Sequence, residues 1–153
     1  MIRHAQVADA AGLANLLRAL TDDLPRFAAE PPELTLGRVT AALTNEAAAH
    51  TLLVTEDGGA LTGFIHAMRQ PSLLLCGGEG FVSALFIRPE ERGRNLGRAL
   101  LAAIEGEARA RGCSRLSLLN MRQRPSYGRG FYAGLGWRER PEAANFVLEL
   151  GGS

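Results

Sequence analysis

The spacing of apolar residues predicts four helices. In each of them an apolar residue recurs at every third or fourth position, so that one face of the helix can be buried. Asp9 and Thr35 can cap the first two helices, and Gly112 and Gly136 stand where helix-ending glycines belong. The predicted helices begin after Asp9 and at Thr35, run from Leu96 to about Arg111, and span Ser126–Leu135.

Between these helices the pattern changes to short apolar runs that are typical of strands. Asp57-Gly58-Gly59 is a turn signal, and it predicts a hairpin between two of the strands. The stretch Gln70–Gly80, which contains the leucine run Leu73–Leu75, is interpreted as a loop. The order of elements, β-α-α-β-β-β-α-β-α-β, indicates a mixed α/β domain with helices packed on a central sheet. The predicted strands are residues 2–6, Thr51–Thr55, Ala60–Met68, Phe81–Ile87, Arg115–Leu119 and Ala144–Leu150.

The composition narrows the classes of function. The chain has 153 residues and a formal net charge of +1, from 17 basic and 16 acidic residues. This length fits one domain, which we expect to span residues 1–153. The balance of charge argues against a nucleic-acid partner, and no apolar run is long enough for a membrane span or a signal peptide. We therefore expect a cytoplasmic protein with no nucleic-acid or membrane partner.

Few side chains are suited to metal or covalent chemistry. All the basic residues are arginines, so Schiff-base chemistry by a lysine is excluded. Cys76 and Cys113 are too few for a disulfide scaffold or a cysteine-built zinc site. His4, His50 and His66 show no i,i+4 pairing. We expect no metal.

One strand–loop–helix segment could hold a phosphate. The loop Arg92–Arg98 contains two glycines and three arginines, and it lies between the strand Phe81–Ile87 and a helix start. The first amides of a helix have no intrahelical partner, and the helix dipole adds partial positive charge there. The alternative is an arginine-rich surface loop that only caps the helix.

The segment Phe81–Leu101, FVSALFIRPEERGRNLGRALL, resembles the acetyl-CoA-binding motif of the GNAT superfamily of N-acetyltransferases. That motif is a strand, V-x-P-x-x-R-G, and R/Q-x-x-G-x-G/A opening a helix. Arg92 fills the first position of the last element and Gly97 the last. Asn95 replaces the first glycine, and asparagine tolerates a left-handed backbone. Three further segments resemble the family: IRHAQVADAAGLANLL, TLLVTEDGGALTGFIHA and FYAGLGW.

The resemblance implies a GNAT-type mixed sheet of about six to seven strands, flanked by about four helices, with a splay between strands 4 and 5. Acetyl-CoA would enter that splay, with its pantetheine arm paired to the backbone of Leu85, Phe86 and Ile87. Asn120 could replace a cofactor-contacting asparagine of the family, whose position is Pro125 here. The pyrophosphate would lie on Arg92, Gly93, Arg94, Asn95, Leu96 and Gly97, with Arg92, Arg94 or Arg98 adding charge.

The resemblance also implies direct attack of a neutral amine on the thioester, with no acyl-enzyme. Tyr132 matches the family position that protonates the CoA sulfur, and Tyr127 is a competitor for that role. Many family members carry a carboxylate base near the positions of Ser83 and Ala84, where this chain has none. Glu79 could act instead through a water. His66, or water alone, are alternatives.

The expected acceptor is a primary amine on a small molecule. A protein or peptide amine is one alternative, and a non-catalytic acyl-CoA-binding module is another. In this family the acceptor is selected partly by the loop after the first helix, where Asp22, Asp23, Glu30 and Glu33 would favour a cationic molecule. The run Leu73–Leu75 suggests a homodimer contact or an extension of the sheet edge.

Overall fold

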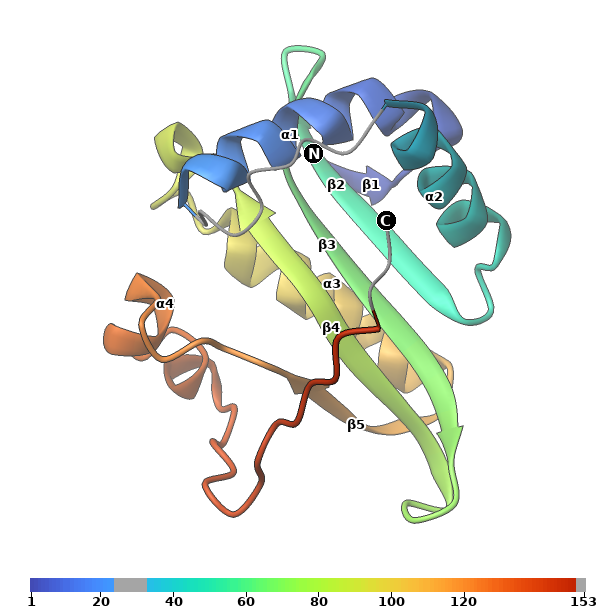
Figure 1. Cartoon of the computed structure of the whole chain (residues 1–153), viewed down its shortest axis with the longest axis vertical. Helices are drawn as coiled ribbons and strands as arrows, with labels where there is room; N and C mark the ends of the chain where they lie inside the picture. The colour runs from blue at the N-terminus through green and yellow to red at the C-terminus, as the bar shows by residue number, and fades with distance from the viewer. Residues whose placement is uncertain (24–32, 151–153) are drawn as a thin grey trace. The chain divides into compact units, whose positions relative to one another are not determined.

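The computed structural model describes residues 1–23 and 33–150, and the side chains of residues 20–36 lie outside that description. The four acidic side chains expected to select a cationic acceptor therefore lie outside it. The chain divides into two compact units, Met1–Leu119 and Asn120–Ser153, and the first holds the sheet. A single domain over residues 1–153 stays a prediction. The elements in Figure 1 are β1 (Ile2–His4), α1 (Ala10–Asp23), α2 (Glu33–Asn45), β2 (His50–Asp57), β3 (Ala60–Ser72), β4 (Gly77–Ile87), α3 (Leu96–Ala110), β5 (Cys113–Leu118) and α4 (Pro125–Gly128).

Five strands form one mixed sheet in the order β1-β2-β3-β4-β5. The three pairs from β1 to β4 are antiparallel, and β4 and β5 are parallel. A parallel pair needs a crossover connection, which α3 supplies. The mixed α/β class with helices packed on a sheet is confirmed. The described part of the chain has five strands, fewer than the six to seven expected.

The sheet is buried on both faces by helices. On one face, α1 packs Leu13 and Leu16 against Leu52, Val54, Phe64 and Phe86. On the other face, α3 buries Leu100, Leu101 and Ile104 (Figure 1). Each such side chain contributes about 1.5–3 kcal/mol relative to an exposed one. The start of α3, which follows β4, is thus fixed by its own apolar face.

The start of α1 is built differently from the prediction. Asp9 ends a short 3-10 turn, Val7–Asp9, rather than capping the helix. Its carboxylate accepts a hydrogen bond from the backbone N–H of Gln6 at 2.7 Å, and it pairs with Arg3 at 2.8 Å. Arg3 also contacts Glu56 at 2.7 Å. Asp9 therefore ties β1 and β2 to the helix start.

The prediction of a loop over Gln70–Gly80 is wrong. β3 continues to Ser72 and β4 begins at Gly77, so only the hairpin tip is irregular. The glycines allow close strand packing here, because a Cβ on Gly80 would lie 2.4 Å from Leu116 of β5. Leu73 and Leu74 at the tip are 97% and 96% exposed.

Two predictions in the second unit are also wrong. The predicted helix Ser126–Leu135 is only the short α4 and a 3-10 turn, Ala133–Leu135. Glycine disfavours helix by about 1 kcal/mol, and Gly130 and Gly136 have positive φ. The predicted strand Ala144–Leu150 pairs with no strand in the described part of the chain. Its alternating apolar residues are exposed, with Phe146 92% accessible.

Candidate functional site

The strands β4 and β5 stop pairing halfway along β4. Their ladder runs from Gly78–Cys113 to Val82–Leu118, whereas β4 continues to Ile87. In the described sheet, the segment Ser83–Ile87 therefore has a ladder partner only on its β3 side. This confirms the splay expected between strands 4 and 5. We call Ser83–Ile87 the unpaired segment, because it has no ladder partner on its β5 side. Leu85, Phe86 and Ile87 lie on it, and the Phe86 side chain is buried in the core.

The loop after β4 leads into α3 through two residues of positive φ. Gly93 has φ 82°, and Asn95 has φ 61° and ψ 16°. Asn95 is thus left-handed, as the sequence predicts, and its side chain makes no cap on the helix. The first intrahelical bond joins Ala99 N to Asn95 O at 3.0 Å. The amides of Leu96, Gly97 and Arg98 precede that bond, so they are available to an anion.

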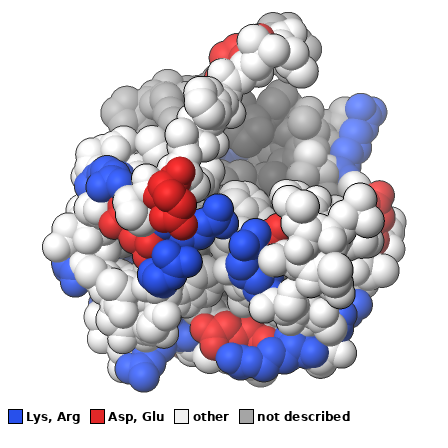
Figure 2. All heavy atoms as spheres, turned by 90° about the horizontal axis from the view of Figure 1, so that it is seen from below, with Lys and Arg blue, Asp and Glu red and all other residues white. Residues whose placement is uncertain are grey.

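The three arginines of this loop differ in their partners. Arg94 contacts Glu91 and, at 3.5 Å, Asp57, and these carboxylates raise the pKa of its guanidinium. Arg92 donates to the backbone oxygen of Ile87 at 3.2 Å and lies 6.0 Å from the centre of the Phe86 ring. Arg98 is exposed on the first turn of α3. On the face drawn in Figure 2, arginines likewise lie beside acidic side chains.

Glu79 lies in the half of β4 that β5 covers. Its Oε1 accepts hydrogen bonds from Arg115 at 2.8 and 3.0 Å and from Ser117 at 3.3 Å, both on β5. The Glu79 side chain is 17% exposed. This carboxylate holds the paired ends of the two strands together, and it lies about 13 Å along the strand from Ser83.

A row of polar side chains crosses three strands beside the unpaired segment. The Ser83 hydroxyl is 2.5 Å from His66 Nδ1, and His66 Nε2 is 3.1 Å from His50 Nδ1. His50 Nε2 lies 3.7 Å from the Glu46 carboxylate, after α2. Burial and the neighbouring His50 lower the pKa of His66 to about 4, so this imidazole is neutral at pH 7. We call these four residues the polar row.

A β-bulge creates the polar row. His66 pairs with Ala84 and Ala67 pairs with Val82, so Ser83 is an extra residue in β4. Bulges re-aim side chains and are common near active sites. Of the four residues in the polar row, the sequence indicated only His66 as a candidate base. Ser83 and His50 were missed as members of one cluster, since neither strand register nor a bulge has a local sequence signal here.

The second unit holds Tyr132, Tyr127 and Asn120. The Tyr132 ring packs edge-on against Phe131 and Trp137, at centre distances of 4.9 and 6.1 Å, and burial raises the pKa of its hydroxyl. Among the described residues, that hydroxyl has no hydrogen-bond partner. Tyr127, in contrast, donates to Glu139 at 3.0 Å and accepts from Arg122 at 3.0 Å. Asn120 accepts from Ser126 at 3.1 Å.

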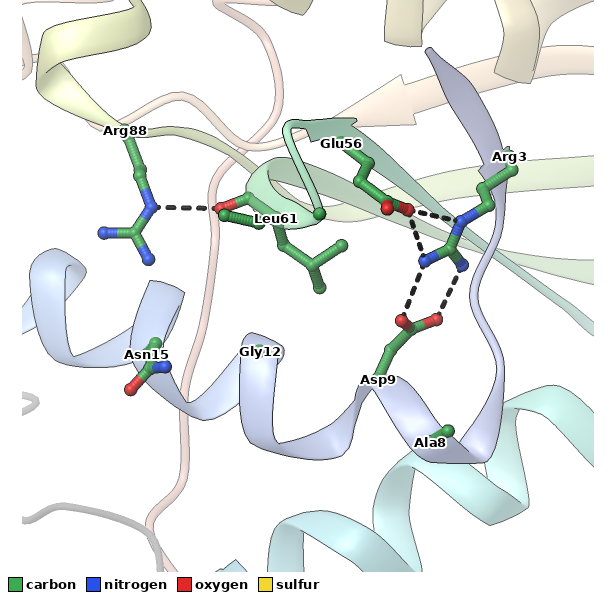
Figure 3. A pocket seen from close by; sticks show the side chains of 10 residues that line it. Arg3, Ala8, Asp9, Gly12, Asn15, Glu56, Leu61 and Arg88 are labelled. Carbon is green, nitrogen blue, oxygen red and sulfur yellow. Dashed lines mark hydrogen bonds and ion pairs between the residues drawn. The ribbon is translucent and has the colours of Figure 1, made fainter.

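A polar cavity of about 310 Å³ lies elsewhere in the first unit, beside the start of α1 (Figure 3). Its charged side chains all have partners within the protein. Arg3 lies between Asp9 and Glu56, and Arg88 donates to the backbone oxygen of Leu61 at 3.0 Å (Figure 3). The Arg3 hydrogen bonds lower the pKa of Asp9. These pairs explain the cavity as a structural feature, and it contains none of the predicted site residues.

The described residues contain no group of three or more His, Cys, Asp or Glu side chains placed to hold a metal ion. None of their helices is both long and apolar enough to cross a membrane.

The sequence model of the Acetyltransferase (GNAT) family matches residues 14–137, which include the splay, the loop, the polar row and Tyr132. The chain belongs to the GNAT acetyltransferase family. Its members are acyltransferases, and acetyl-CoA is their general acetyl donor. No curated protein sequence matches this GNAT chain.

Solved structures share the GNAT fold of this chain at low sequence identity. Ribosomal-protein-alanine N-acetyltransferase from Brucella melitensis biovar Abortus 2308 has a TM-score of 0.74 and 21% identity, covering 98% of this chain and 99% of its own. Glucosamine-6-phosphate N-acetyltransferase from Arabidopsis thaliana has a TM-score of 0.80 and 18% identity, covering 98% and 97%. A putative acetyltransferase from Agrobacterium tumefaciens str. C58 has a TM-score of 0.81 and 22% identity, covering 97% and 99%.

Proposed function

We propose that this GNAT acetyltransferase moves an acetyl group from acetyl-CoA to a primary amine on a small molecule. The observation that carries the proposal is the loss of the β5 partner after Val82, in a strand that leads directly to uncapped helix amides. An extended, amide-bearing arm can pair with the free strand edge, and a diphosphate can accept from the amides. The residues present thus fit acetyl-CoA.

The binding roles follow the order of the chain. The amides from Arg92 to Gly97 would hold the pyrophosphate, with Arg92 and Arg98 adding positive charge. Arg94 adds less, because Glu91 and Asp57 already contact its guanidinium. The backbone of Leu85–Ile87 would pair with the pantetheine arm, and the thioester would then point along β4 toward Ser83. Asn120 stays a proposed contact of that arm.

Tyr132 is proposed to protonate the sulfur of the leaving CoA. A tyrosine hydroxyl has a pKa of about 10, and burial raises the pKa of Tyr132 further, so it carries its proton at pH 7. Its hydroxyl has no hydrogen-bond partner among the described residues, whereas Tyr127 is engaged by Glu139 and Arg122. The geometry within the second unit therefore favours Tyr132 over its competitor.

The expected base, Glu79, is less suited to the reaction than the sequence suggests. Arg115 and Ser117 hold its Oε1, and it lies where β4 and β5 are still paired. His66 lies across from the unpaired segment, opposite Ala84. We therefore favour His66 over Glu79 as the group that accepts the amine proton.

The acceptor, the cellular location and the oligomeric state of the protein are also part of the proposal. A protein amine is the second candidate, favoured by the likeness in fold to the ribosomal-protein-alanine N-acetyltransferase. A cytoplasmic protein that forms a homodimer stays a proposal as well. The exposed Leu73 and Leu74 at the β3–β4 tip support a contact between copies.

The test is a thiol-release assay on a panel of small amines and peptide amines, together with calorimetry of CoA binding. We expect CoA to bind and thiol to be released with small amines. Release only with peptides would support the second candidate. Binding without release on any amine would support a non-catalytic acyl-CoA-binding module, and no binding would reject the proposal.

A further inference from the structure

The contacts of the polar row, Ser83–His66–His50–Glu46, allow two arrangements of protons, because the Ser83 hydroxyl can donate to His66 Nδ1 or, at 3.3 Å, to the His66 backbone oxygen. The Glu46 carboxylate, 3.7 Å from His50 Nε2, only accepts and so favours the arrangement with a proton on His50 Nε2. His50 Nδ1 then accepts from His66 Nε2, and His66 Nδ1 accepts from the Ser83 hydroxyl. These positions are assigned from the hydrogen-bond partners. In this arrangement every donor points toward Glu46, and Ser83 Oγ keeps its lone pairs for an incoming N–H.

The two ends of the polar row differ in their surroundings. Ser83 is exposed and stands on the unpaired segment of β4, next in line along the strand from the proposed pantetheine contacts. The Glu46 side chain, at the other end, is 67% exposed, whereas that of His50 is only 19% exposed. The polar row therefore connects the unpaired segment of β4, where the thioester is proposed to lie, with the exposed Glu46 through two shielded imidazoles.

We propose that Ser83, His66 and His50 form a proton relay that removes the proton lost by the acceptor nitrogen as it attacks the thioester. Ser83 is the entrance, His66 is the proton acceptor, and His50 passes the proton to solvent beside Glu46. The relay rests on the acetyl transfer proposed above, and it assigns to that reaction a base that the sequence leaves open.

A bond forms between the acceptor nitrogen and the carbonyl carbon, and the nitrogen becomes positively charged and acidic. Its proton passes to Ser83 Oγ while the Ser83 proton passes to His66 Nδ1. His66 then gives its Nε2 proton to His50 Nδ1, and the His50 Nε2 proton leaves to water. Exchange with solvent returns the protons of both rings from Nδ1 to Nε2 before the next turnover. The carbon–sulfur bond breaks with its electrons on sulfur, which takes a proton from Tyr132, and Tyr132 regains one from water.

The electrostatics of the polar row suit this step. A neutral imidazole with a pKa of about 4 is a weak base, so it takes a proton only from a strongly acidic donor. The attacking nitrogen is such a donor, whereas the free ammonium of the acceptor is not. Two charged residues contact His50 of the row, Glu46 through its carboxylate and Arg69 at the backbone. Arg69 donates to the backbone oxygen atoms of Ala47 and His50 rather than to the rings.

The first test compares Ser83→Ala and His66→Gln with two matched controls, Ser114→Ala on β5 and His4→Gln on β1. We expect each relay variant to lower kcat by about 100-fold with unchanged CoA affinity, because a positioned base contributes about 10²–10⁴-fold. The controls should keep their rates. Ser83→Ala and His66→Gln with kcat within about threefold of the wild type would overturn the relay.

A second test does not depend on turnover. Nitrogen NMR of the histidine-labelled chain should show protons on Nε2 of both His66 and His50 at neutral pH, and Ser83→Ala should shift the His66 Nδ1 signal. A proton on His66 Nδ1 would overturn the relay. So would acetylation of Ser83 in the intact mass of the chain with acetyl-CoA, since Ser83 would then be a nucleophile.

The experiments distinguish a failure of the relay from a failure of the proposed function. If the wild-type chain neither binds CoA nor releases thiol, acetyl transfer fails and the relay fails with it. If the wild-type chain transfers acetyl groups and the relay variants do so equally well, only the relay is wrong.

Discussion

The two halves of β4 differ in what holds them. In the first half, Gly77–Val82, residues 78–82 pair with both β3 and β5, and the one carboxylate, Glu79, is bound by Arg115. Ser83–Ile87 pairs with β3 alone, and its first residue is bulged out toward His66. The first half is thus structural, because both of its backbone edges are paired, and we call it the closed half. The second half, which we call the open half, has one backbone edge that a ligand can pair with. Backbone pairing, rather than residue type, divides the strand.

The largest expected effect tests the loop that follows the open half. Gly97→Glu should weaken acetyl-CoA affinity by more than about 100-fold, because a carboxylate beside a diphosphate costs several kcal/mol. Calorimetry measures this, with Gly106→Glu as the control on an exposed turn of the same helix, where an added Cβ meets no atom within 4 Å. Unchanged affinity in Gly97→Glu would show that the open half leads to no phosphate site.

The second effect concerns the proton donor proposed for the reaction at the open half. Tyr132→Phe should lower kcat by about 100-fold and leave CoA affinity nearly unchanged, because only the hydroxyl is lost. Steady-state kinetics and calorimetry together separate the two quantities. Tyr127→Phe is the control and should retain its rate. A large loss of affinity in Tyr132→Phe would make this tyrosine a structural residue.

A third prediction concerns the one ladder that the open half keeps. A Cβ on Gly63 of β3 would lie 2.7 Å from the Phe86 backbone oxygen and 2.5 Å from the Ile87 side chain. Gly63→Ala should therefore lower the free energy of unfolding by about 1–3 kcal/mol in urea titrations. Gly77→Ala, whose Cβ would be 3.6 Å from its nearest neighbour, is the control in the closed half. Equal stability of the two variants would contradict this difference.

A fourth prediction uses the pKa of His66, which is lowered from 6.5 to about 4. Unfolded His66 binds a proton below pH 6.5, whereas the folded residue stays neutral down to about pH 4. Its contribution to stability is therefore fully present above pH 6.5 and is lost as the pH falls toward 4. Urea titrations at several pH values should show this loss in the wild type and a weaker one in His66→Gln. An identical pH dependence would contradict the shift.

The smallest effect is expected in the closed half. Glu79→Gln should change the free energy of unfolding by less than about 1 kcal/mol, since the ion pair is partly exposed, and should leave kcat unchanged. Denaturation and kinetics on the same preparation test both statements. A fall in kcat of about 100-fold would instead return Glu79 to the role of base and place the chemistry in the closed half.

The sequence predicts best where local rules decide. The periodic leucines of α3 and the tolerance of asparagine for positive φ place the helix and the loop correctly, including Asn95. Local patterns mislead in both directions. The glycines of Gly77–Gly80 suggest a loop, but the segment packs closely against β5, and Ala144–Leu150 alternates like a strand but has no described partner. The polar row depends on strand register and a bulge, which nonlocal pairing sets.

The burial of α3 has a consequence for ligand recognition. Leu100, Leu101 and Ile104 anchor the helix in the core, only one turn or two beyond the amides at its start. Those amides are therefore immobilised during folding, long before any donor molecule arrives. Association then spends little entropy on ordering the receptor, so affinity should depend chiefly on the freedom that the flexible ligand itself gives up.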